Sequence, residues 1–263
     1  MKPSIEFGGI QNFYYISKKH FGKLRRLQTK ANIIIYDGFD NCRWNGGRIN
    51  ADIKLEDYKN HFELLNISIA STFSNYKIDL DDTVGNKLLN QLSNHYVVLN
   101  NDELNNYITN NYPTITRILS FTSLDCTTQD YLKREDYYDL IVPKIDLLFN
   151  EEFLSKINKS KYQILLDEQC NKCPIFFEHY NEVCDINNHT IQLNETEIKQ
   201  KHSCYLIDKN IQNTLGLELV SKKHISRLVD LGFKHFKIPG REKSLEFQER
   251  VFLNSYEIFM SVL

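Results

Sequence analysis

Six cysteines are the residues in this chain best suited to bind a metal, and four of them lie between positions 167 and 216. Cys170 and Cys173 form a Cys-x-x-Cys-Pro motif directly after an apolar run. This spacing lets two sulfurs converge on one metal ion or cluster. The motif is typical of a zinc half-site, an iron–sulfur half-site or a redox dithiol; two buried thiols without a function are the alternative.

The remaining ligands must come from other parts of the chain. Cys42 follows the first predicted strand, and in a barrel the loops after the strands meet at one face. Four thiolates without an obligatory histidine favour a [4Fe–4S] cluster or zinc, and ligands from scattered loops favour the cluster. We predict the ligands Cys42, Cys170, Cys173 and Cys204, with Cys184 as the alternative fourth ligand and Cys126 after it.

Residues around these cysteines are candidates for substrate binding. Trp44, Asn45 and Arg48 lie in a loop that contains a Gly-Gly pair. An indole face and an arginine can hold a planar or anionic ligand, and a packed Trp in a tight turn is the alternative. His179, beyond the cysteine motif, is a candidate hydrogen-bonding residue.

The last predicted strand supplies further polar groups. Lys237 alternates with Phe236 and Ile238, so we expect it to point into the barrel, where an amine needs a partner or a function. An exposed lysine on an edge strand is the alternative. Arg241 would help to position the substrate, and Glu168 and Glu242 are candidates for proton transfer.

These residues are carried by alternating strand-like and helix-like segments. Eight short apolar runs occur at 32–36, 67–70, 96–99, 117–121, 139–142, 163–166, 217–220 and 236–238. Stretches with helical spacing separate most of them. The pattern predicts one (β/α)₈-type barrel domain over residues 1–263, irregular in form, with 167–216 as a cysteine-bearing insertion between strands six and seven. A doubly wound open sheet is the alternative.

Composition excludes several classes of protein. The 32 basic residues are balanced by 34 acidic residues, so there is no charge signature for nucleic-acid binding. No apolar stretch is long enough for a membrane span. No secretory signal is visible at the N-terminus, and we therefore expect a cytoplasmic protein with reduced thiols.

Four segments resemble the U32 family, known as collagenase-like peptidases. The segment 232–242 is similar to that family's "G-hydrophobic-x-x-FKIEGR" signature, and 167–174 is similar to its cysteine motif. The segments 177–180 and 44–48 look like those of short phage and bacterial relatives. The resemblance implies a barrel-like domain and a [4Fe–4S] cluster. In some ubiquinone-biosynthesis members one early and three late cysteines bind it, which agrees with the four ligands predicted above.

The resemblance also implies a function. Characterised relatives act in oxygen-independent hydroxylation of ubiquinone precursors or RNA bases, often with partner proteins. We therefore expect an iron–sulfur enzyme or enzyme subunit acting on a small molecule or nucleoside. A non-catalytic zinc or cluster scaffold acting through a protein partner is the alternative, favoured by Pro239 where relatives have a glutamate. A peptidase is disfavoured, because the sequence has neither an HExxH nor a GxSxG motif.

Overall fold

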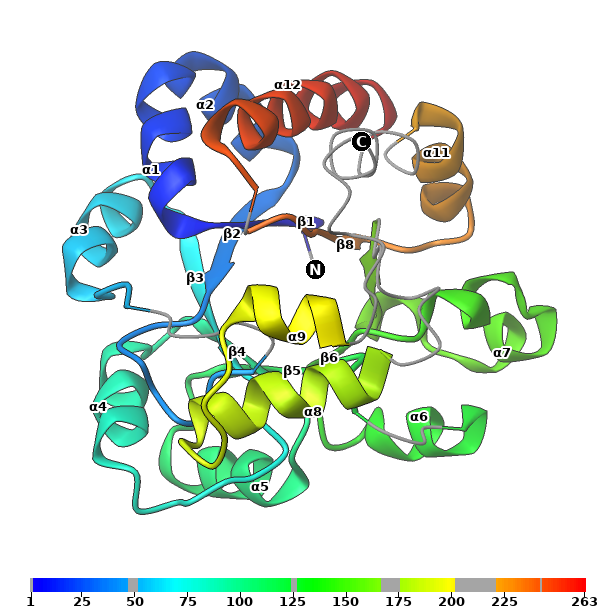
Figure 1. The fold of residues 1–263 in the computed structure, drawn as a ribbon. Coiled ribbons are helices and arrows are strands. Elements are labelled where there is room, and N and C mark those ends of the chain that lie inside the picture. The colour runs from blue at the N-terminus through cyan, green and yellow to red at the C-terminus, as the bar shows by residue number, and fades with distance from the viewer. Residues whose placement is uncertain (1, 47–51, 124–126, 167–175, 202–220, 242) are drawn as a thin grey trace.

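Eight parallel strands form a single, nearly closed barrel in the computed structural model, which describes residues 2–46, 52–123, 127–166, 176–201, 221–241 and 243–263 (Figure 1). The strand order is β6-β5-β4-β3-β2-β1-β8-β7. A bridge between Ile141 and Tyr162 brings the two edges together. The strands are β1 (Ser4–Gly8), β2 (Asn32–Asp37), β3 (Ser68–Phe73), β4 (Tyr96–Leu99), β5 (Thr116–Leu119), β6 (Leu140–Ile141), β7 (Gln163–Leu165) and β8 (His235–Ile238).

Alternation along the strands creates two apolar layers. Successive side chains of a strand point to opposite faces, so Ile34 and Tyr36 of β2 pack inside the barrel while Ile33 and Ile35 pack outward. The outer layer is large and joins the strands to the helices, and the inner layer is small. Polar side chains therefore have room inside the barrel.

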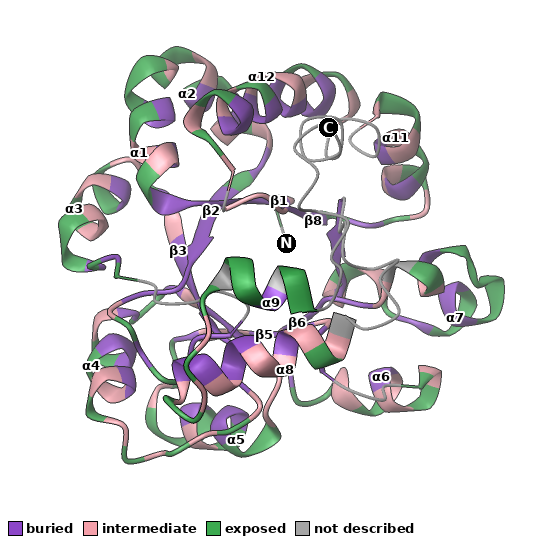
Figure 2. Cartoon of the chain, viewed as in Figure 1, coloured by how far each residue is buried: buried purple, intermediate pink, exposed green. Residues whose placement is uncertain are grey.

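Helices surround the barrel and turn their buried faces toward it (Figure 2). Several begin at a side chain that accepts a backbone N–H, such as Asp82, Asn101 and Ser244. The outer helices are α1 (Ile10–Lys19), α2 (Phe21–Lys30), α3 (Glu56–Leu64), α4 (Thr83–Gln91), α5 (Asp102–Asn111), α6 (Thr128–Arg134), α7 (Glu151–Lys156), α11 (Lys222–Asp230) and α12 (Leu245–Val262). Short 3₁₀ helices span Ile145–Phe149 and Lys159–Lys161, and two further helices, α8 (Phe176–Asn187) and α9 (Glu195–Lys201), follow β7.

The barrel prediction is confirmed, but one of the strands was not predicted. The sequence reading missed β1, because Glu6 interrupts its apolar residues. The apolar run at 163–166, predicted as the sixth strand, is β7, and β7 pairs directly with β8. The cysteine-bearing insertion thus connects β7 to β8, and the strand predicted at 217–220 lies outside the described residues.

Within the described ranges, no helix combines the length and the apolar character that crossing a membrane requires.

A glycine in α4 provides a test of packing in the outer layer. A Cβ on Gly85 would lie 2.4 Å from the Trp44 ring, whereas a Cβ on Gly22 in α2 would meet no atom within 4 Å. We expect Gly85→Ala to lower the free energy of unfolding by about 1–3 kcal/mol through overpacking. Gly22→Ala, the control, should be neutral or stabilising by up to about 1 kcal/mol. Urea unfolding measures both, and an unchanged stability of Gly85→Ala would contradict this packing.

A buried histidine makes stability depend on pH. His235 is 2% exposed, and its Nδ1 lies 2.8 Å from Ser4 Oγ. Burial lowers the pKa of His235 from 6.5 to about 4. The folded protein therefore disfavours the charged form of His235. The contribution of the neutral imidazole to the free energy of unfolding is fully present above pH 6.5 and is lost as the pH falls from 6.5 through 4.

We expect wild type to lose about 2 kcal/mol more than His235→Gln between pH 7 and pH 5. Urea unfolding at the two pH values gives the difference. Equal losses in the two proteins would show that His235 titrates normally in the folded state.

Candidate functional site at the barrel mouth

Helix α8 covers the end of the barrel at which the strands finish. We call this region the barrel mouth: the loops after β2, β3 and β8, together with α8. The Tyr180 hydroxyl of α8 donates to the carbonyl oxygen of Ser74 at 2.8 Å. The Asn187 amide donates to the carbonyl oxygen of Asn45 at 3.0 Å. Because these partners follow β3 and β2, the helix lies where parallel barrels hold their sites.

The two faces of α8 have different roles. Val183 and Ile186 pack against Ile198 of α9, in a small apolar cluster separate from the barrel layers. At the edge of the mouth, Asp185 accepts hydrogen bonds from the Tyr76 hydroxyl at 2.6 Å and the Lys77 ammonium at 2.7 Å. Polar contacts therefore dominate the attachment of α8 to the loop after β3.

A cysteine lies on the mouth-facing side of α8. Cys184 is fully buried and follows Tyr180 by one helical turn. Burial raises the pKa of the Tyr180 hydroxyl, the nearby Cys184 raises it further, and Arg241 opposes the shift. The Tyr180 hydroxyl also lies beside Gly46, since a Cβ on Gly46 would lie 2.3 Å from it, and the Gly46 carbonyl oxygen accepts a hydrogen bond from Arg241.

An ion pair occupies the barrel interior below the mouth. The Lys237 ammonium of β8 binds the carboxylate of Glu6 of β1, and Gln163 Nε2 donates to the other carboxylate oxygen at 2.7 Å. Glu6 is 0% exposed and Lys237 is 7% exposed. Lys237 does point inward, as its alternation with apolar residues indicated. The sequence reading missed Glu6, although a charge between Ile5 and Phe7 was a visible signal.

Arg241 follows β8 and reaches across the mouth. Its guanidinium donates to Thr72 Oγ1 at 2.9 Å and to the carbonyl oxygen of Gly46 at 3.1 Å. Gln248 of α12 donates to the carbonyl oxygens of Gly240 and Arg241 and fixes this turn. Three elements therefore hold the arginine in place.

The loop after β2 packs into the outer layer. The Cys42 thiol donates to Asp82 at 3.5 Å, and burial raises its pKa. The Trp44 ring is 0% exposed, packs edge-on against Phe73 and donates through Nε1 to a backbone oxygen at 2.8 Å. Asn45 is also buried. In this conformation the protein covers both faces of the indole.

Most of the other predicted site residues have no described position. His179 is half-buried on α8. The described part of the chain contains no cluster of three metal-binding side chains. Arg48, Cys126, Glu168, Cys170, Cys173, Cys204 and Glu242 lie outside the described residues, so the metal site stays a prediction.

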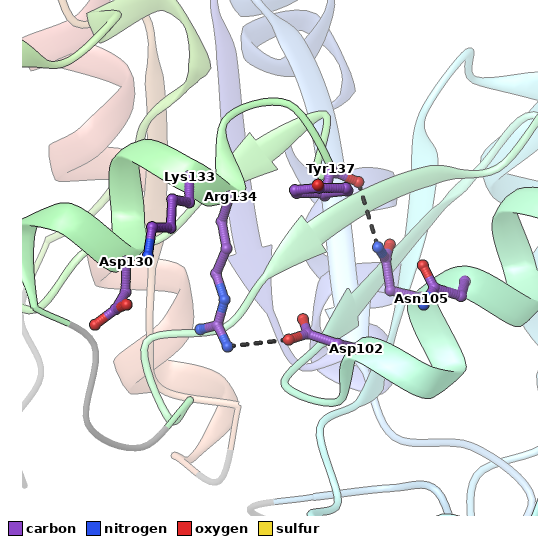
Figure 3. A pocket seen from close by; sticks show the side chains of 7 residues that line it. Asp102, Asn105, Asp130, Lys133, Arg134 and Tyr137 are labelled. Carbon is purple, nitrogen blue, oxygen red and sulfur yellow. Dashed lines mark hydrogen bonds and ion pairs between the residues drawn. The ribbon is translucent and has the colours of Figure 1, made fainter.

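A cavity of about 340 Å³ lies elsewhere, between α5 and α6 (Figure 3). Arg134 pairs with Asp102 across it at 3.1 Å, and Asn105 Nδ2 donates to the Tyr137 carbonyl oxygen at 3.3 Å. The Tyr138 hydroxyl also donates to Asp102, at 2.7 Å. These bonds join two outer helices, so the cavity is a polar gap between α5 and α6 whose side chains bind one another.

One solved structure with this architecture is that of the U32 peptidase Mk0906. The two proteins superimpose with a TM-score of 0.50 and 14% identity, over 74% of this chain and 80% of the other. The chain has the fold of a U32 peptidase. This likeness shows the fold alone, and the fold is the one that the resemblance of the sequence implied. No family model matches the chain, and no curated protein matches it either.

The buried Glu6–Lys237 pair should contribute strongly to the stability of this U32 fold. Removing one partner of a buried pair leaves an uncompensated charge, so Lys237→Met should cost about 3–5 kcal/mol. The double variant Glu6→Gln/Lys237→Met should recover much of this loss. Lys156→Met, which breaks the exposed pair with Glu152, should cost at most about 1 kcal/mol. Urea unfolding measures all three, and equal losses in the two single variants would contradict the buried pair.

Proposed function

We propose that this chain is a U32-like iron–sulfur protein that modifies a small anionic molecule or a nucleoside at the barrel mouth, as an enzyme or an enzyme subunit. Oxygen-independent hydroxylation is the reaction class that the sequence resemblance favours. The observation that carries the proposal is that Arg241 and the Tyr180 hydroxyl meet at Gly46 in the mouth, with the buried Cys184 one helical turn from Tyr180. A mouth of this kind is the usual place for a barrel enzyme's site.

The two described cysteines differ in how well they suit a [4Fe–4S] cluster. Cys184 is buried on the mouth side of α8, the helix that begins three residues after Cys173. Cys42 lies in the outer apolar layer, with its thiol on Asp82. These placements favour Cys184 over Cys42 as the partner of Cys170, Cys173 and Cys204.

The chain's own residues have distinct roles in this proposal. When bound, the cluster would supply electron transfer, with a potential set by burial and hydrogen bonds. Arg241, with Arg48, binds and orients the anionic or planar part of the substrate. Glu168 and Glu242 donate or accept protons at its reacting atoms.

A non-catalytic scaffold is the second candidate. In it, the same thiolates hold zinc, and the surface acts through a protein partner. Two features favour this alternative. Lys237 already has Glu6 as its counter-ion, and Pro239 removes a carboxylate from the turn at the mouth.

Anaerobic purification with analysis of iron, sulfide and zinc tests the proposal. We expect iron and sulfide, together with a broad absorbance at about 400 nm that is typical of Fe–S thiolate ligation. Cys184→Ser should lose most of the iron, because a serine hydroxyl is a poor substitute for a soft thiolate. Cys42→Ser, the matched buried control, should keep it.

Each other outcome has a definite meaning. Zinc without iron supports the scaffold. A metal-free protein that cleaves peptides contradicts the proposal and favours a peptidase. Loss of iron in Cys42→Ser but not in Cys184→Ser would restore Cys42 as the fourth ligand.

A further inference from the structure

Four side chains form a column from the barrel interior to the mouth. At its base the Glu6 carboxylate binds the Lys237 ammonium. That ammonium lies 3.7 Å from the centroid of the Tyr36 ring, and Arg241 Cζ lies 5.9 Å from the same centroid. Both distances are within the range of cation–π attraction. One aromatic ring therefore contacts the buried cation and the cation at the mouth.

The backbone of β1 makes room for this ring. Gly8 pairs in register with Tyr36, and a Cβ on Gly8 would lie 2.8 Å from the Tyr36 Cζ and hydroxyl oxygen. It would also lie 3.1 Å from Arg241 Cβ. The absence of a side chain at Gly8 thus lets the ring and the arginine lie against the strand.

We propose that Glu6 and Tyr36 are positioning residues that set the Arg241 guanidinium to bind an anionic group of the substrate. The inference rests on the proposed function and adds two residues to it. Glu6 keeps the Lys237 amine charged and in place, because a buried ammonium without a counter-charge loses its proton or moves. The ammonium holds the Tyr36 ring, and the ring supports Arg241.

Simple electrostatics makes the opposite prediction for Glu6. The column carries one negative charge on Glu6 and two positive charges on Lys237 and Arg241. If Glu6 acted only through its charge, Glu6→Gln would leave the mouth at least as positive as before, and anion binding would be unchanged or stronger. If Glu6 acts through position, the same variant weakens binding. The sign of the change separates the two roles.

The experiment titrates the protein with inorganic phosphate and with acetate. The Nε–Hε resonance of Arg241, assigned by its loss in Arg241→Lys, reports binding. We expect Glu6→Gln and Tyr36→Leu to weaken binding roughly fivefold, a size usual for residues in one contact network. Tyr36→Phe keeps the ring and should bind like wild type. Glu152→Gln removes the same charge from the exposed surface of α7 and serves as the control.

Three results would overturn the inference: no shift of the Arg241 resonance with either anion, unchanged or tighter binding in Glu6→Gln, or equal binding in Tyr36→Leu and wild type. If Glu6→Gln does not fold, wild type still gives a test. Stacking on Tyr36 must shift the Lys237 ε-methylene protons upfield, and unshifted protons would also overturn the inference. None of these readouts depends on iron content. A failure of the proposed cluster would therefore be distinguishable from a failure of the proposed positioning of Arg241.

Discussion

A lysine ammonium buried inside a barrel is stable only beside a counter-charge. For Lys237 of β8, Glu6 of the neighbouring strand β1 supplies that charge. Desolvation makes each charge costly alone, so the two residues depend on each other. The pair ties β1 to β8, and Gln163 extends the contact to β7. The polar interior of the barrel is therefore concentrated on these three adjacent strands.

This concentration divides the barrel into two halves. Ile34, Val98, Ile118 and Leu140 fill the interior with apolar side chains from β2, β4, β5 and β6. Arg241 follows β8 on the polar side and, at the mouth, donates hydrogen bonds to Thr72 of β3 and to Gly46 in the loop after β2. The proposed site thus combines a charged group with a partly apolar barrel interior, and this combination suits the anionic or planar substrate of the proposed function.

Helix α8 completes the mouth in a different way. Its contacts with the barrel loops are largely hydrogen bonds and an ion pair, while its apolar residues pack on α9. It is therefore held above the barrel by specific polar partners, and its own small apolar cluster stabilises it. This division places Tyr180 and Cys184 against the mouth and leaves Val183 and Ile186 facing away.

The likeness to a U32 peptidase at 14% identity shows how weakly this fold constrains sequence. A parallel barrel needs alternating apolar strands and outer helices with one apolar face, and many sequences meet this requirement. Function must therefore be argued from the residues at the mouth and not from the architecture.

The sequence by itself determined the barrel, because strand–helix alternation and buried β-branched runs are local patterns. It also indicated the inward direction of Lys237, since a strand's side chains alternate. Only the tertiary structure decided which residues meet. The partnership of Glu6 with Lys237 joins residues separated by 231 positions, and local patterns carry no information about such pairs. The burial of Trp44 and the separate placements of Cys42 and Cys184 likewise depend on packing between distant elements, because a cysteine or an indole has the same local sequence signal in a core as in a site.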